Sequence, residues 1–140
     1  MIMYTKIYKP LPLEAKEIRI QVFMKEQGFQ NEFDDIDSIA HHIVVFYQDI
    51  PVGTCRFFKE ENHYTIGRVA VLKEYRKLHL GHVLLDAAET EIKKMNGQEI
   101  VVHSQVQASK FYAKKGYVQF GQIDDDEGVP HMWMKKKIQY

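Results

Sequence analysis

The stretch "VAVLKEYRKLHLGHVLLDAAE" (residues 69–89) decides the fold class, because it turns from a strand pattern into a helix pattern across a basic loop. Its first residues are apolar and mostly β-branched, which is typical of a buried strand. After a loop at residues 73–80, apolar residues recur at helical spacing over residues 81–95, and Asn96 and Gly97 end the pattern. The stretch therefore predicts a strand, a loop and a helix in succession.

The junction between this strand and this helix can hold an anion. A helix begins with unpaired N–H groups and a partial positive charge, and Arg76 and Lys77 add charge to the loop. Gly81 leaves room for a bulky group beside the start of the helix. A solvated loop with surface charges explains the same residues equally well, and the sequence contains neither a Walker loop nor a GxGxxG fingerprint. The residues alone leave a phosphate-bearing ligand and a plain surface loop both open.

The rest of the chain predicts a mixed sheet covered by helices. Strands are expected at residues 4–8, at residues 42–58 as a pair around a turn near Asp49 and Pro51, and at residues 64–72, 99–104, 116–123 and 129–138. Helices are expected at residues 11–28, 81–95 and 106–115. A strand, helix, strand unit inside an otherwise antiparallel pattern implies a mixed sheet with helices on its faces. The predicted class is α/β or α+β, in one domain over residues 1–140.

The bulk composition argues against several classes of protein. The 19 basic side chains balance the 19 acidic ones, so the formal net charge is zero and nucleic acid is not expected as a partner. The single cysteine, Cys55, cannot form an internal disulfide, and no signal-peptide pattern opens the chain. No apolar run approaches the roughly 20 residues that cross a bilayer. We expect a cytoplasmic protein without a membrane partner.

The basic loop resembles the signature of the GNAT superfamily of acetyl-coenzyme A dependent N-acetyltransferases, which is [QR]-x-x-G-x-[GA] between a strand and a helix. The match runs from Arg76 to Gly81, with His79 where the family usually has its first glycine. "SKFYAKKGYV", which contains Tyr112, resembles a later motif of the superfamily. "VFMKEQGF", "DSIAHHIV", "GTCR" and "EGVPHMWM" are similar to the ElaA-like branch, so the resemblance covers nearly the whole chain.

The resemblance implies a single-domain GNAT fold: a twisted, mixed and mostly antiparallel sheet with helices on both faces and a splayed parallel strand pair. It implies acetyl-CoA as cosubstrate and no metal. The coenzyme pyrophosphate is expected against backbone N–H groups of the loop, and the side chain of His79 is expected to point outward. The loop residues expected at the coenzyme are Arg76, Lys77, Leu78, His79, Leu80, Gly81 and His82.

The resemblance also assigns roles for the reaction. The pantetheine arm is expected between the diverging strands "RVAV" and "EIVV", against backbone groups of Val69 and Val71. The N–H of Val71 is the candidate for stabilising the oxyanion. Tyr112 matches the tyrosine that protonates the departing thiolate, and a phenol with a pKa near 10 is suited to that transfer. A purely structural tyrosine, packing a helix onto the sheet, is the alternative for Tyr112.

The general base is less sharply indicated. Glu26, His42, His103 and His131 can each accept a proton directly or through a water molecule. Glu26 follows the first predicted helix, where the family forms one wall of the acceptor site, and His42 lies at a strand start. We predict Glu26 and His42 as catalytic residues beside Tyr112. A surface carboxylate and hydrogen-bonded structural histidines remain the alternatives.

The leading functional hypothesis is transfer of an acetyl group from acetyl-CoA to a primary amine, on a small molecule or a peptide. Direct transfer is preferred, because Cys55 lies in an apolar strand and is expected to be a buried, inert thiol. The alternative is a coenzyme A binding or sensor module without catalysis. An adaptor that uses the basic residues at 76–77, 114–115 and 135–137 fits the balanced charge poorly. Exposed edge strands make a homodimer possible.

The acidic segments suggest no metal site. "FDDIDS" and "DDDEG" lack the spacing of an EF-hand and are interpreted as solvated turns. The seven histidines form no HExxH motif and no Cys/His ligand set, so zinc is not expected.

Overall fold

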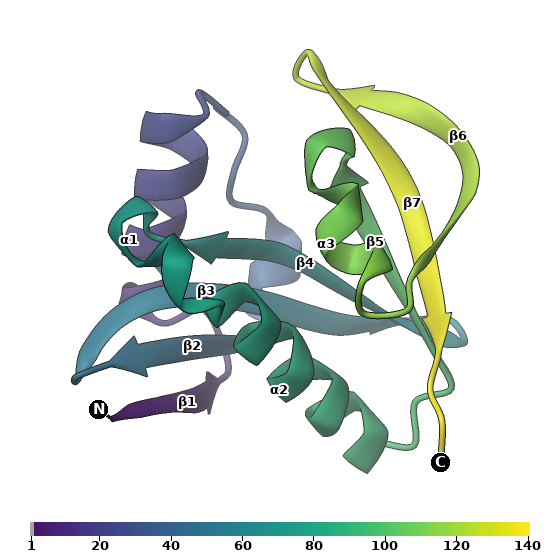
Figure 1. The fold of residues 1–140 in the computed structure, drawn as a ribbon, viewed down its shortest axis with the longest axis horizontal. Coiled ribbons are helices and arrows are strands. Elements are labelled where there is room, and N and C mark those ends of the chain that lie inside the picture. The colour runs from purple at the N-terminus through teal and green to yellow at the C-terminus, as the bar shows by residue number, and fades with distance from the viewer. Residues whose placement is uncertain (1) are drawn as a thin grey trace.

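The computed structural model describes residues 2–140, and the strands of this part of the chain form one seven-stranded sheet in the order β1-β2-β3-β4-β5-β7-β6 (Figure 1). Neighbouring strands are antiparallel except β4 and β5, which are parallel. The predicted mixed, mostly antiparallel sheet is therefore confirmed. The strands are β1 (Met3–Tyr8), β2 (His41–Tyr47), β3 (Ile50–Glu60), β4 (His63–Val71), β5 (Glu99–Gln105), β6 (Val118–Asp126) and β7 (Val129–Lys137).

The helices follow the predicted order, with two differences in type. The helix predicted at residues 11–28 is an α-helix that continues as a π-helix, before Gly28 takes φ +83°. The helix predicted at residues 106–115 divides into a 3-10 turn and one short α-helix. The α-helices are α1 (Leu13–Arg19), α2 (Leu80–Lys94) and α3 (Ser109–Ala113); η1 (Ile20–Glu26) is the π-helix, and η2 (Asp35–Ser38), η3 (Lys73–Leu78) and η4 (Val106–Ala108) are 3-10 helices. Of the helices in residues 2–140, none combines the length and the apolar character that a membrane span needs.

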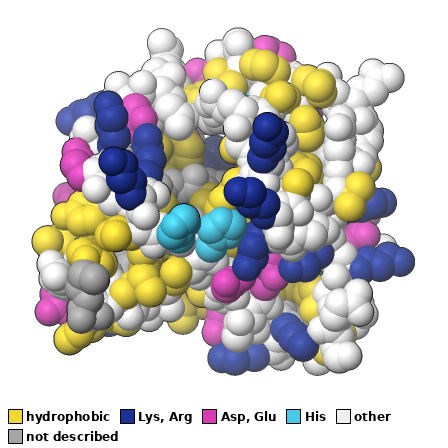
Figure 2. All heavy atoms as spheres, in the orientation of Figure 1, with side chains coloured by type: hydrophobic (Ala, Val, Ile, Leu, Met, Phe, Trp, Pro, Cys, Tyr) yellow, Lys and Arg dark blue, Asp and Glu magenta, His cyan; other side chains and the backbone are white. Residues whose placement is uncertain are grey.

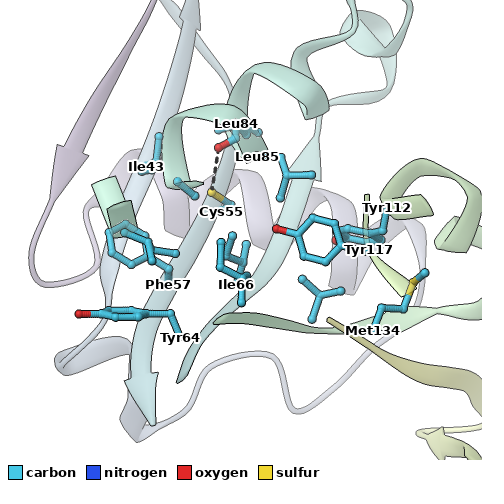
Figure 3. Packing of buried hydrophobic residues seen from close by; sticks show 14 of the residues in the cluster. Ile43, Cys55, Phe57, Tyr64, Ile66, Leu84, Leu85, Tyr112, Tyr117 and Met134 are labelled. Atoms are coloured by element: carbon cyan, nitrogen blue, oxygen red, sulfur yellow. Dashed lines mark hydrogen bonds between the residues drawn. The ribbon is translucent and has the colours of Figure 1, made fainter. Parts of the chain in front are cut away.

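Helices cover both faces of the sheet, and each face has its own apolar core. Successive side chains of a strand point to opposite faces. On β2, Ile43 and Val45 accordingly join the core under α2, whereas Val44 and Phe46 join the core under α1 and η1. Figure 3 shows the larger core, where Cys55 of β3 points toward Leu84 of α2. The prediction of helices on both faces is confirmed.

The parallel strands β4 and β5 pair over only a short length. The ladder joins Tyr64–Ile66 to Ile100–Val102 and then stops. Beyond it, β4 contains a bulge in which Arg68 and Val69 oppose Cys55 alone, and Arg68 takes φ +52°. A bulge bends a strand and increases its local twist. The outer part of β4 thus leaves β5, which confirms the predicted splayed pair.

The last hairpin differs from the prediction at its turn. The segment "DDDEG" is not a five-residue turn, because Asp124, Asp125 and Asp126 continue β6 and pair with β7. Only Glu127 and Gly128 form the turn, and both have positive φ. Positive φ at both central residues suits the twist of a tight two-residue hairpin. The paired part of the hairpin is therefore longer, and its turn shorter, than the sequence pattern indicated.

Candidate active site

Two clefts meet where β4 and β5 separate. The first, of about 300 Å³, lies at the start of α2 and is called here the α2 cleft. The second, of about 230 Å³, lies beneath the β6–β7 hairpin and is called the hairpin cleft. Val69, Ala108 and Tyr112 line both. Figure 2 shows this face of the molecule hollowed between its two halves, with Lys and Arg side chains on either rim and histidine side chains below the hollow.

The α2 cleft opens onto an uncapped helix N-terminus. No side chain caps α2, so its first N–H groups are free to face a ligand. His79 stands at the N-cap with φ +58°, in the left-handed region that glycine adopts most easily. Histidine is among the few other residues that are enriched there. This backbone requirement explains why a glycine is usual at this position of the signature, and His79 meets it without closing the cleft.

The side chains at the start of α2 lie as follows. His79 is exposed at the rim of the α2 cleft, its ring 6.4 Å from that of His82, which packs 4.7 Å from the ring of Phe111. A Cβ on Gly81 would lie 3.1 Å from the ring of Phe111, so the glycine permits α2 and α3 to approach. Gly81 thus has a packing role in addition to the predicted space for a ligand. The remaining loop residues are Lys77 and Leu78, both exposed at the end of η3, and Leu80, which is buried.

The backbone of Val71 faces the gap between the splayed strands. Leu72 donates its N–H to the carbonyl of Val52, 2.8 Å away, on the β3 side. Successive residues of a strand direct their N–H groups to opposite sides, so the N–H of Val71 points away from β3. Val71 and Val69 both line the α2 cleft. The N–H of Val71 therefore faces the gap, and the contact of Val69 and Val71 with a pantetheine arm stays a prediction.

Arg76 and Glu26 lie together beside this gap. The guanidinium donates two hydrogen bonds to the carboxylate, at 2.7 and 2.6 Å, and its Nε donates to the carbonyl of Val71 at 2.9 Å. Hydrogen bonding to Arg76 lowers the pKa of Glu26. The pair joins η1 to the end of β4. A role for Glu26 as base, or for Arg76 at a phosphate, requires this bidentate pair to open.

Tyr112 stands at the junction of the two clefts. Its ring belongs to the core under α2, where it packs edge-on to Tyr117 with 5.8 Å between ring centroids (Figure 3). Within residues 2–140 its hydroxyl has no hydrogen-bond partner, whereas the hydroxyl of Tyr117 donates to Glu89 at 2.7 Å. Burial raises the pKa of Tyr112 above its usual value, so the phenol keeps its proton at neutral pH. A protonated hydroxyl that bonds to no other side chain or backbone group of residues 2–140 can donate a proton to a bound ligand.

Two histidines line the hairpin cleft. Nε2 of His103 lies 2.7 Å from a carboxylate oxygen of Asp124, and the ring stacks 4.4 Å from Trp133. This hydrogen bond to His103 lowers the pKa of Asp124. His131 is 6% exposed, and its Nδ1 lies 2.8 Å from the carbonyl of Val129. The structure thus brings His103 and His131, two of the four candidates for the general base, to the same cleft.

The structure does not bring His42 to either cleft. The side chain is fully buried on β2, and its Nε2 bonds to the carbonyl of Asp37 at 3.0 Å. Burial lowers the pKa of His42. Cys55 is also buried, and burial raises the pKa of its thiol to about 12. The thiol therefore stays protonated at neutral pH, as the expectation of an inert cysteine requires.

A buried ionic cluster supports the hairpin cleft, and the sequence interpretation missed it. Arg19 bonds to Glu32 at 2.9 Å and to Asp37 at 2.7 Å, and Arg56 bonds to Asp34 at 2.6 Å and to Asp37 at 2.9 Å. Arg68, re-aimed by the β4 bulge, bonds to Glu32 at 2.9 Å, and both line the cleft. One signal was available: Arg19 follows Ala15 by four residues and so shares the apolar face of α1.

This cluster corrects the interpretation of "FDDIDS" as a solvated turn. Asp37 is 6% exposed, and Asp34 and Asp37 form a capping box that starts η2. Burial opposes the ionisation of Asp37, but its bonds to Arg19 outweigh that cost and lower its pKa to about 2. The carboxylates of the acidic segment form ion pairs that stabilise the wall of the hairpin cleft. Across residues 2–140, no group of three or more His, Cys, Asp or Glu side chains is arranged to hold a metal ion.

Comparisons with known proteins agree with this architecture. A Bacillus subtilis (strain 168) protein named as a candidate acetyltransferase is 38% identical over 128 residues, which cover 88% of this chain and 87% of that protein. A candidate N-acetyltransferase of known structure from Lactobacillus plantarum matches with a TM-score of 0.88 and 28% identity, covering 98% of this chain and 99% of that one. Escherichia coli ElaA has the same fold, with a TM-score of 0.84, 22% identity, and coverage of 96% and 99%.

Residues 12–138 match the family described as the acetyltransferase (GNAT) domain. The match spans the splayed strands, the uncapped helix and both clefts. The chain therefore belongs to the GNAT family of acetyltransferases.

Proposed function

We propose that this acetyltransferase moves the acetyl group of acetyl-CoA directly to a primary amine, with the coenzyme in the α2 cleft and the amine in the hairpin cleft. The observation that carries the proposal is the meeting of the two clefts at Tyr112. One cleft offers free N–H groups suited to an anion, and the other contains ionisable side chains. A donor and an acceptor placed in them meet beside a protonated hydroxyl.

The α2 cleft is suited to coenzyme A. Its diphosphate would lie against the free N–H groups at the start of α2, with Lys77 near the mouth. Its pantetheine arm would run along the backbone of Val69 and Val71, which faces the gap. Because Arg76 is paired with Glu26, we assign it to holding η1 against β4 rather than to the phosphates.

The proposed chemistry needs no covalent enzyme intermediate. The neutral amine attacks the thioester carbonyl, a C–N bond forms, and the C–S bond breaks. The N–H of Val71 stabilises the oxyanion that develops, and Tyr112 donates its proton to the departing sulfur. The buried, protonated thiol of Cys55 is consistent with direct transfer, and a free cysteine is consistent with the cytoplasmic location that we propose.

A coenzyme A binding module without catalysis is the second candidate. The observation that favours it is the closed Arg76–Glu26 pair, which occupies one predicted base. Calorimetric titration with acetyl-CoA, followed by thiol release in the presence of spermidine, kanamycin or a lysine-containing peptide, separates the two. Binding with thiol release supports the transferase, binding without release supports the module, and no binding at millimolar acetyl-CoA contradicts both.

A further inference from the structure

We propose that His131 is the catalytic base that takes the proton from the acceptor amine. The inference rests on the proposed acetyl transfer and selects one residue from the four that the sequence left open. It is carried by the position of His131 in the hairpin cleft and by the hydrogen bond of its ring.

The hydrogen bond fixes which nitrogen is free. A backbone carbonyl can only accept, so the contact of 2.8 Å to Val129 requires Nδ1 of His131 to carry a hydrogen. In a neutral imidazole the other nitrogen, Nε2, then has a bare lone pair. No residue within 2–140 bonds to Nε2. The ring is therefore held in the form that accepts a proton, with its accepting atom unoccupied.

The ring of His131 lies in the cleft that we propose for the acceptor amine. His131 is more than nine-tenths buried and lines the same cleft as Tyr112. Its ring packs 4.7 Å from that of His103 on β5, and it pairs with Asp124 on β6. The other charged groups around the cleft are Glu32, Arg68 and Asp126.

The other three candidates are less suited to this step. Glu26 is held by two hydrogen bonds from Arg76, and His42 is buried outside both clefts. Nε2 of His103 faces the carboxylate of Asp124, which can only accept, so that nitrogen is a donor and Nδ1 is the accepting atom of a neutral ring. His103 and His131 thus each keep one accepting nitrogen in the hairpin cleft, and we select His131 because its side chain is buried there, whereas His103 is partly exposed.

The proton balance closes with two residues. As the C–N bond forms, the attacking nitrogen becomes positively charged and passes one proton to Nε2 of His131. As the C–S bond breaks, Tyr112 gives one proton to sulfur. The imidazolium then releases its proton to solvent through the open end of the cleft, and the phenolate of Tyr112 takes one back.

The first test reads the free nitrogen directly. The unmodified protein, labelled with ¹⁵N-histidine, is titrated by NMR between about pH 5 and 8. We expect the neutral ring of His131 to carry its hydrogen on Nδ1, with Nε2 unprotonated. A neutral ring with its hydrogen on Nε2 would overturn the proposal, and this measurement needs no acceptor.

The second test measures the base in catalysis with His131→Asn, whose amide can still donate to the carbonyl of Val129. We expect kcat with the acceptor found by thiol release to fall about 100- to 10,000-fold, and the rise of kcat with pH that a general base produces to disappear. His63→Asn, at the far end of β4, should keep both the rate and the rise. A preserved rise in H131N with transfer intact overturns the role of His131. Absence of transfer by the unmodified protein instead counts against the proposed function.

Discussion

The two clefts of this protein are built in different ways. The α2 cleft is formed almost wholly by two short segments of chain, residues 69–82 and 108–112. The hairpin cleft collects residues from η1, the loop after it, β4, β5 and the β6–β7 hairpin. Glu127 at the hairpin tip accepts hydrogen bonds from the N–H groups of Gln30 and Asn31, 97 and 96 residues away in sequence. A site made from neighbouring residues can be recognised in a sequence, whereas one made from distant residues depends on the whole fold.

The clefts also differ in how their walls are stabilised. The α2 cleft has apolar walls and relies on backbone N–H groups at a helix start. The wall of the hairpin cleft is tied to a buried cluster of three arginines and three carboxylates. Buried ion pairs are costly to form and very costly to break singly. The side of the molecule that contains the hairpin cleft is therefore the one where a single charge change should reduce the free energy of unfolding most.

The largest expected effect lies where the clefts meet. Tyr112→Phe removes the proposed acid, and we expect turnover at saturating acetyl-CoA to fall by about 100- to 10,000-fold. Stability should change little, because the hydroxyl has no protein partner in residues 2–140. The matched control is Tyr117→Phe, which loses its bond to Glu89 and should lose about 1 kcal/mol of stability but no turnover. Unchanged turnover in Y112F across pH would remove Tyr112 from the mechanism.

The next effect tests the ionic wall of the hairpin cleft. Arg19→Met leaves Glu32 and Asp37 without their shared partner, and we expect the free energy of unfolding to fall by about 3–5 kcal/mol. Lys94→Met is the control, because it breaks a surface pair with Glu91 and should cost less than about 1 kcal/mol. Urea unfolding measures both. Equal losses of unfolding free energy in the two variants would mean that the buried cluster stabilises the protein no more than a surface ion pair does.

The same cluster predicts how stability depends on pH. The pKa of Asp37 is lowered from its usual 3.8 to about 2, so its contribution, about 2 kcal/mol, is complete above pH 3.8 and is lost as the pH falls toward 2. Burial raises the pKa of Glu32, so Glu32 takes up its proton at a higher pH than Asp37. That proton removes a charge that burial makes unfavourable, which delays the loss of stability. Urea midpoints from pH 7 to pH 2 should therefore fall mainly below pH 4.

A pair of substitutions identifies the carboxyl group that causes this loss of stability in acid. Asp37→Asn should flatten the decline below pH 4, since the amide cannot titrate, whereas Asp35→Asn, at an exposed neighbour, should leave the decline in place. A D37N protein that loses stability as steeply as the unmodified one would assign the acid sensitivity to other groups.

The smallest effect concerns the α2 cleft. His79→Gly removes an exposed side chain from a left-handed position that glycine also adopts. We expect the affinity for coenzyme A, measured by calorimetry, to change by less than about threefold. A tenfold gain would show that the imidazole obstructs the cleft, contrary to the expectation that it points outward.

Much of the fold was predictable because its signals are local. The strand and the helix within residues 69–89 were visible as a change of period, and the structure confirms them within a residue or two, whereas most of the predicted loop between them forms the 3-10 helix η3. The π-helical half of the first helix was not predictable, because Ile18 and Val22 keep the i, i+4 spacing of an α-helix and π-helices are rare. The length of the last hairpin was missed because Asp124–Asp126 look like turn residues, yet pair as a strand with β7.

The candidate site divides in the same way. Tyr112 and the start of α2 were named from contiguous motifs, and the structure brings them to one cleft. The partnership of Arg76 with Glu26, 50 residues away, could not be read from either residue. Nor could the free nitrogen of His131, since its accepting role depends on a backbone carbonyl that the hairpin places beside it.

The sequence by itself determined the order of the elements, the family and the helix start that follows the basic loop, because periodicity and motif spacing act over a few residues. Only the tertiary structure decided which side chains pair with one another and which remain free for a substrate. Arg76 and Arg19 are bound in ion pairs, while Tyr112 and His131 are left open to the clefts. The physical reason is that charge pairing and burial are set by contacts between distant segments, which the local pattern of a chain does not encode.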